Sequence, residues 1–134
     1  MKKYLISLII IFVGISIANA FDKEITPLYK ILDNPKSFNK KKLTTIGKID
    51  LQFEHDTLTI IPCWPIAGSK PIAIWIDVSK IDILKKGNPN HINVKVSGIF
   101  IEKDKGHFEA YPGTLILDDI EKLSEKDSSL KCKM

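Results

Sequence analysis

Arginine is absent from this chain: all 20 basic residues are lysines. Arginine supplies the rigid, two-pronged hydrogen-bonding group that suits phosphates and guanine. The formal net charge is only +4, and it falls to about +2 if a leader that includes Lys2 and Lys3 is removed. This composition is a poor basis for reading nucleic acid, and we expect no nucleic-acid partner.

Motifs of known catalytic chemistry are missing as well. The chain has no Gly-x-Ser-x-Gly turn for a nucleophilic serine and no His-Glu-x-x-His zinc motif. It also has no glycine-rich phosphate loop, because its glycines are scattered singly. The sequence therefore predicts a protein that is not an enzyme and that holds no cofactor.

Only one long hydrophobic run is present, and it lies at the N-terminus. Lys2 and Lys3 precede an apolar stretch over residues 4–17, and Ala18-Asn19-Ala20 follows. This order is that of a signal peptide with its cleavage site, residues 1–20. The alternative is a retained membrane anchor, although the run is shorter than the about 20 residues that a spanning helix needs. We expect export to the periplasm or the extracellular space, and no membrane span after cleavage.

Cysteine is scarce: Cys63 and Cys132 are the only two, and both follow the leader. An even number of cysteines in an oxidising compartment favours a disulfide, which would join the C-terminal tail to the middle of the domain. The alternative is two free thiols, because the sequence does not give the distance between the sulfur atoms.

The mature chain is organised as one β-rich domain, residues 21–123, and a polar tail, residues 124–134. A short helix is expected over residues 25–32, with Thr26 as its N-cap and Pro27 at its first position, and Asn34-Pro35 ends it. Alternating apolar residues then predict strands over 43–53, 57–61, 72–78, 91–102 and 108–117, the last interrupted by Pro112-Gly113, with a short segment over 120–123. The predicted fold class is mainly β: a five-stranded OB-like barrel with a short N-terminal helix after the signal peptide.

The alternation also predicts which side chains face the core. In the first strand the shared face runs from Leu43 to Phe53 through Gly47, where the missing side chain indicates a bend or bulge. In the third strand Ile72, Ile74 and Ile76 lie opposite Trp75. The core face of the fourth strand comprises Ile92, Val94, Val96, Gly98 and Phe100.

Two stretches carry a particular order of turns and strands. Residues 28–47 contain a short helix, an Asn-Pro stop, an aromatic residue, a polar turn and a strand with a glycine. A late hairpin contains Val96-Ser97-Gly98-Ile99-Phe100, Lys105-Gly106-His107-Phe108 and Tyr111-Pro112-Gly113-Thr114-Leu115. Together they resemble a group of uncharacterised small exported bacterial proteins with an OB-like β-barrel. The resemblance implies the fold and the export, and no activity. Lys40 stands where that group has a turn glycine, so a longer turn is expected here.

Polar residues on two predicted turns suggest a metal site. Glu54 and His55 lie on the first turn, and His107 and Glu109 lie on the late hairpin. If the fold brings the two turns together, these four residues have the donor atoms for a divalent cation such as zinc. The alternative is an ordinary polar turn, because successive residues of a strand point to opposite faces. His107 itself is either a ligand or general base, or a structural residue bonded to a nearby carbonyl.

Aromatic residues suggest a binding surface. Exposed aromatic side chains on an OB barrel form stacking platforms, and the predicted ligand-binding residues are Trp64, Trp75, His107 and Tyr111. The alternative is that these rings cover the core, and for Trp75 that it packs beneath the leading helix.

These features predict an exported, non-catalytic binding protein of the bacterial envelope, with a protein or envelope component as its partner. Two other functions remain open: an immunity or inhibitor protein against an envelope-acting toxin, and a metal-binding protein or metal-dependent enzyme that uses His55 and His107.

Overall fold

The computed structural model describes residues 24–61 and 72–124. The predicted signal peptide, Trp64, both cysteines and the polar tail beyond residue 124 lie outside the described residues. No helix in the described part of the chain is long and apolar enough to cross a membrane.

The described chain is mainly β, with five strands arranged in a ring. The strands are β1 (Lys42–Gln52), β2 (His55–Thr59), β3 (Ala73–Asp77), β4 (Asn93–Ile101) and β5 (Thr114–Lys122). They follow the order β1-β2-β3-β5-β4, and β4 pairs back with β1. All neighbours are antiparallel except β3 and β5, which are parallel.

Strand β1 closes the ring because it is long enough to pair with two neighbouring strands. Residues 42–48 pair with β4, and residues 48–52 pair with β2. Gly47 lies at this changeover, where a Cβ atom would come within 2.6 Å of the Leu58 side chain. The register shift of the sheet lies elsewhere, between Ser97 and Gly98 of β4, and a Cβ on Gly98 would lie 2.1 Å from the Ile116 carbonyl oxygen. Of the bend or bulge predicted at Gly47, the bulge is wrong, because the only register shift in the described strands lies between Ser97 and Gly98, at the second close approach.

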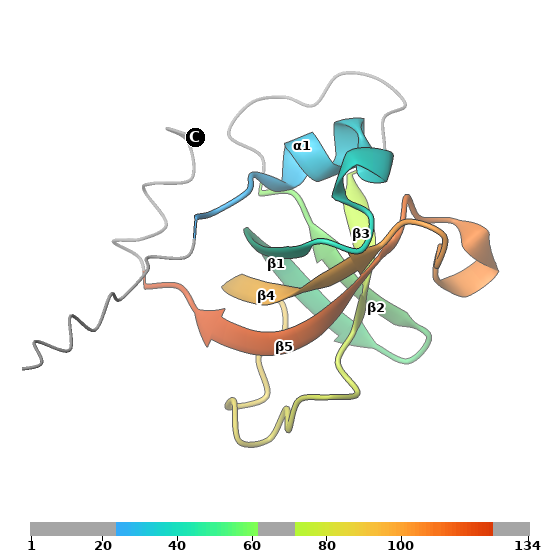
Figure 1. Ribbon diagram of the computed structural model, residues 1–134. Coiled ribbons are helices and arrows are strands. Elements are labelled where there is room, and N and C mark those ends of the chain that lie inside the picture. The colour runs from blue at the N-terminus through green and yellow to red at the C-terminus, as the bar shows by residue number, and fades with distance from the viewer. Residues whose placement is uncertain (1–23, 62–71, 125–134) are drawn as a thin grey trace, which may run out of the picture.

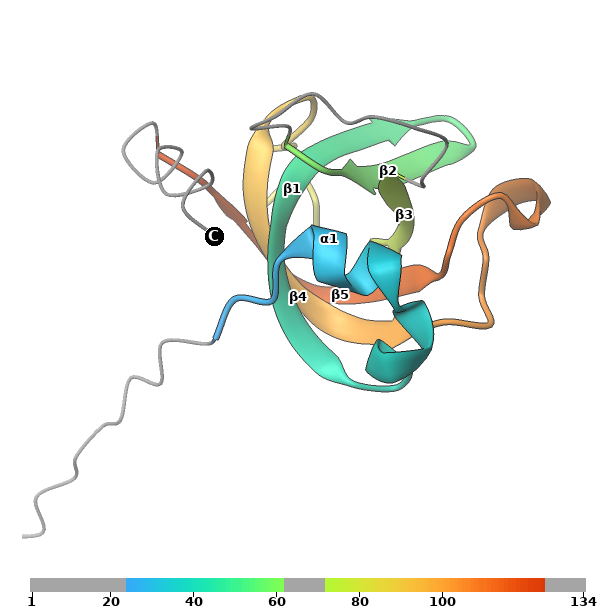
Figure 2. The ribbon, with the colours of Figure 1, turned by 90° about the horizontal axis from the view of Figure 1, so that it is seen from above.

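One short helix, α1 (Leu28–Asp33), lies over one end of the ring (Figures 1 and 2). It buries Leu28, Ile31 and Leu32 against the strands. The helix ends before Pro35, as predicted, and the 3-10 helix η1 (Pro35–Phe38) follows. Thr26 is not the N-cap of α1, which is Pro27. The Thr26 N–H instead donates to the Thr44 carbonyl at 2.8 Å, which joins the incoming chain to β1.

The inner face of the ring follows the predicted alternation in β3 and β4. Ile74 and Ile76 of β3 and Val94, Val96 and Phe100 of β4 are fully buried. Two residues predicted on core faces are exposed instead. Phe53 lies beyond the end of β1, and 92% of its surface is exposed, while Ile72 precedes β3 and is 46% exposed. Both lie where the strand, and with it the alternation, has ended.

Two further predictions about turns are corrected. The last strand does not begin at residue 108, because residues 107–109 form the 3-10 segment η2 (His107–Glu109). Strand β5 begins at Thr114 and continues to Lys122, so residues 120–122 belong to it and do not form a separate segment. Proline at 112 has no N–H for a ladder, which explains why pairing begins only at Thr114. Lys40 takes the left-handed conformation of the expected glycine itself, with φ 60°. Its N–H donates to the Phe100 carbonyl.

Candidate functional site

Two segments far apart in the sequence meet beside the ring. The turn between β1 and β2 and the loop between β4 and β5 lie next to each other in both Figures 1 and 2. The His107 Nε2 atom lies 3.9 Å from a Glu54 carboxylate oxygen. The Tyr111 hydroxyl lies 3.4 Å from His55 Nδ1. These contacts connect the two segments directly.

Trp75 lies at the centre of this region. Its neighbours Ile74 and Ile76 point into the ring, so strand alternation turns the indole outward. The His107 ring stacks over it with centroids 6.4 Å apart, and the Tyr111 ring lies 5.4 Å away at an angle of 52°. We call Trp75, His107, Tyr111 and His55 the aromatic face.

Gly106 allows the loop to reach Trp75. Its φ is +68°, and a Cβ atom there would lie 2.7 Å from two carbons of the indole. Only glycine combines this backbone conformation with so close an approach. The Trp75 backbone N–H donates to the Gly113 carbonyl at 3.1 Å, which holds the other end of the loop. Trp75 therefore packs against the loop between β4 and β5, and not beneath α1.

Each of the two segments carries a large exposed apolar side chain, Phe53 on the turn between β1 and β2 and Phe108 on the loop between β4 and β5. Phe108 is 88% exposed, and both it and Glu109 have a φ of 54° although neither is glycine. Such conformations are uncommon and strained in residues with a side chain. We call Phe53, Glu54, Phe108 and Glu109 the loop surface.

An open pocket adjoins the aromatic face. Its lining includes Trp75 and the carboxylate residues Asp56, Asp77 and Asp104. Burial, together with the nearby Asp77 carboxylate, raises the pKa of Asp56. Hydrogen bonds from Ser79, whose backbone N–H lies 2.9 Å from Asp77, lower the pKa of Asp77. We call these three carboxylates and Trp75 the acidic pocket.

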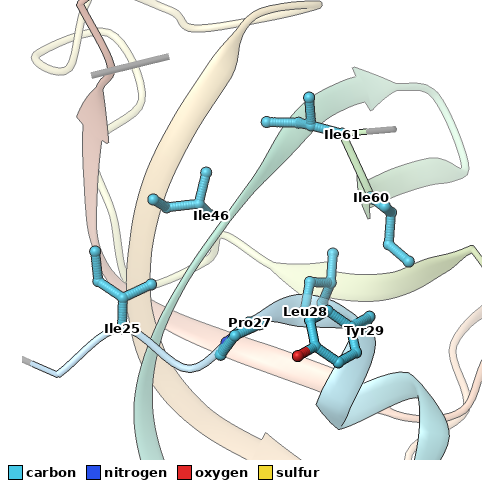
Figure 3. Close-up of a pocket in the computed structure, with 7 residues that line it drawn as sticks. All are labelled: Ile25, Pro27, Leu28, Tyr29, Ile46, Ile60 and Ile61. Atoms are coloured by element: carbon cyan, nitrogen blue, oxygen red, sulfur yellow. The ribbon is translucent and has the colours of Figure 1, made fainter. Parts of the chain in front are cut away.

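A second pocket, beside α1, is apolar (Figure 3). Its lining comprises Ile25, Pro27, Leu28, Tyr29, Ile46, Ile60 and Ile61. Among the described residues, none that line it carries a charge, so the described lining suits an apolar group. None of the residues that the sequence analysis selected lies in it.

Of the predicted ligand-binding residues, Trp64 lies outside the described residues, and Trp75 is in ring contact with both His107 and Tyr111. The residues suggested as metal ligands are distributed differently. Glu54 lies near His107, whereas His55 faces Tyr111, and the described residues contain no group of three His, Cys, Asp or Glu side chains placed to hold a metal ion.

Sequence reasoning missed Phe53 and Asp77. Phe53 was assigned to the core because it continues the alternation of β1. The pairing of Asp56 and Asp77 depends on β2 lying beside β3, and no local pattern signals it. His55 was predicted as a metal ligand, whereas its ring lies against the Tyr111 hydroxyl.

Comparison with known proteins adds nothing to this geometry. No protein-family model matches the chain. No curated protein shows significant sequence similarity to it.

Proposed function

We propose that this protein is an exported, non-catalytic binding protein of the bacterial envelope, and that the aromatic face binds its partner. The observation that carries the proposal is the meeting of Trp75, His107 and Tyr111 at the side of the ring. These residues come from β3 and from the loop between β4 and β5, and the turn between β1 and β2 borders them.

The proposal includes an OB-like identity for the fold. The strand order, the parallel β3–β5 pair and the shared long strand β1 are consistent with it. OB-folds bind ligands on the face of their second and third strands, between the loop that joins strands 1 and 2 and the loop that joins strands 4 and 5. The aromatic face has this location. Export rests on the signal-peptide pattern of residues 1–20.

The chemistry of the region favours a protein or envelope component over nucleic acid. Glu54 lies beside the His107 ring, and three carboxylates line the adjoining pocket. A nucleic-acid site needs the opposite charge, since its phosphates are bound chiefly by lysine and arginine. Aromatic residues are the usual centres of protein–protein contacts.

Site-specific photo-crosslinking in living cells tests the proposal. A photoreactive phenylalanine analogue replaces Phe108, and as a control Leu84, which is 81% exposed in the segment between β3 and β4. That segment lies at the bottom of Figure 1, away from the loop of β4 and β5. We expect a discrete crosslinked partner from position 108 and none from position 84.

The crosslinked partner is then purified and titrated against the full mature protein. Saturable binding that is weakened by Tyr111→Ala supports the proposal, and binding that is unchanged by it contradicts the assigned face. The identity of the partner separates the functions: a toxin that acts on the envelope indicates an immunity protein, and any other envelope protein indicates a general binding role.

A further inference from the structure

We propose that the loop surface and the acidic pocket together bind a basic segment of a partner protein, in which a lysine or arginine adjoins apolar side chains. This inference rests on the proposed function, since it specifies the chemistry of the partner that the same region binds. Three features of the described residues lead to it.

The first feature is the pair of exposed phenylalanines. Phe53 and Phe108 are 92% and 88% exposed, and they belong to two segments held together by the contact of Glu54 with His107. Exposed apolar side chains on adjoining segments suit an interaction surface. Phe108 also has a left-handed φ of 54°, an uncommon conformation for a residue with a side chain.

The second feature is the charge of the two segments. Residues 53–56 and 102–113 contain five acidic residues and two lysines, in a chain whose net charge is +4. One of the lysines, Lys105, already lies 3.6 Å from Glu102. The negative charge therefore gathers around the phenylalanines, where it attracts a basic partner and repels anionic membrane lipids.

The third feature is the acidic pocket itself. Besides burial, the carboxylates of Asp77 and Asp50 raise the pKa of Asp56, while His55 lowers it. Lys80 acts on Asp77, whose carboxylate also accepts the Ser79 N–H. An ammonium or guanidinium group in this pocket would relieve the repulsion between the carboxylates. Trp75, whose aromatic ring attracts cations, also lines the pocket.

The arrangement fits a side chain better than a metal ion. The described residues contain no group of three side chains placed to hold a metal ion, and the Trp75 indole has no ligand atom for a metal. A lysine or arginine has an apolar stem that packs along an aromatic ring while its charged end reaches a carboxylate. Neighbouring apolar residues of the same segment can then contact Phe108 and Phe53.

Peptide titration of the full mature protein tests the inference. The probes are acetyl-Leu-Phe-Lys-Leu-Phe-amide and the same peptide with norleucine in place of lysine, which keeps the stem and removes the charge. Binding is followed by the ¹⁵N-HSQC signal of the Trp75 indole N–H. We expect the lysine peptide to shift this signal and to bind at least about fivefold more tightly than the norleucine peptide.

A double substitution locates the charge effect. Asp56→Asn with Asp77→Asn should remove the preference for lysine and leave the binding of the norleucine peptide unchanged. The control is Glu121→Gln, which removes one charge from β5 where Glu121 faces Lys95 at 3.1 Å, and which should retain the preference.

Three outcomes overturn the inference: equal binding of both peptides, a preference for lysine that survives the double substitution, and no binding of either peptide at millimolar concentration. A vesicle of anionic lipid that shifts the Trp75 signal more strongly than the lysine peptide also overturns it. None of these outcomes removes the proposed function, which fails only if the crosslinking partner is absent or binds elsewhere.

Discussion

Gly106 lies against the indole ring of Trp75, so closely that a Cβ atom on residue 106 would come within 2.7 Å of the ring. Gly106 belongs to the loop between β4 and β5, and Trp75 belongs to β3, 31 positions earlier in the chain. This contact fixes the height of the loop over the sheet. The positions of His107 and Tyr111 on the aromatic face depend on it.

The first prediction concerns this contact. Gly106→Ala adds a methyl group that clashes with Trp75 and also strains a backbone with a φ of +68°. We expect a loss of about 2 kcal/mol or more in the free energy of unfolding, measured by urea denaturation. We also expect the loop to move, seen as a change in the near-UV circular dichroism of the tryptophans.

A matched control separates the clash from the strain. Gly87→Ala has a similar φ of +78°, but its nearest neighbour is the flexible end of Lys122 at 3.2 Å. It should lose only about 1 kcal/mol and leave the near-UV spectrum unchanged. Equal losses at both positions would contradict the importance of the Trp75 contact.

The second prediction concerns the buried hydrogen bond that helps to close the ring. The hydroxyl groups of Thr44 on β1 and Ser97 on β4 lie 2.8 Å apart, and both residues are buried. Ser97→Ala should lower the free energy of unfolding by about 1–2 kcal/mol, because it leaves the Thr44 hydroxyl without a partner. The double variant Thr44→Val with Ser97→Ala should lose less than the sum of the two single losses. Additive losses would show that the hydroxyls are independent.

The third prediction concerns the strain at Phe108. Its φ is 54° and its side chain is 88% exposed, so Phe108→Asn relieves backbone strain and loses little packing. We expect the free energy of unfolding to rise by up to about 1 kcal/mol, because asparagine tolerates this conformation better. Crosslinking-partner affinity should fall in the same variant. A variant that is clearly destabilised would show that Phe108 supports the fold instead of binding.

The fourth prediction concerns the two carboxylates of the acidic pocket, which respond to pH in opposite directions. The pKa of Asp56 is raised above its usual 3.8 by burial and by Asp77. Its contribution to stability is therefore fully present below pH 3.8 and is lost as the pH rises through the raised pKa. The pKa of Asp77 is lowered by its hydrogen bonds with Ser79. Its contribution is present above pH 3.8 and is lost as the pH falls through the lowered pKa.

Neutral substitutions at the two positions should therefore differ in sign. At pH 7 Asp56→Asn should raise the free energy of unfolding, by no more than about 0.5 kcal/mol because solvent screens a partly exposed group. Asp77→Asn should lower it, since the charged acceptor of Ser79 is lost. Both differences should shrink as the pH falls below 4 in denaturant titrations. Effects of the same sign would contradict the opposite directions of the two pKa shifts.

Much of the fold could be predicted because its rules are local. Ile74 and Ile76 face the core by simple alternation, and Pro35 ends α1 because it disfavours the helical conformation of the residue before it. Prediction failed where alternation was extended past the end of a strand, at Phe53 and Ile72. It failed again at residues 108 and 109, because the left-handed backbone there has no signature in the residue types.

The candidate site could be predicted only in its members. The sequence by itself determined that Trp75 points away from the core, since strand period acts over a few positions, whereas it assigned Tyr111 to a strand that in fact begins only at Thr114. Only the tertiary structure decided that these rings meet, that Glu54 and His55 face the same loop, and that Asp56 lies beside Asp77. Each of these contacts requires pairings between strands distant in the chain, which close the ring collectively and which no local pattern specifies.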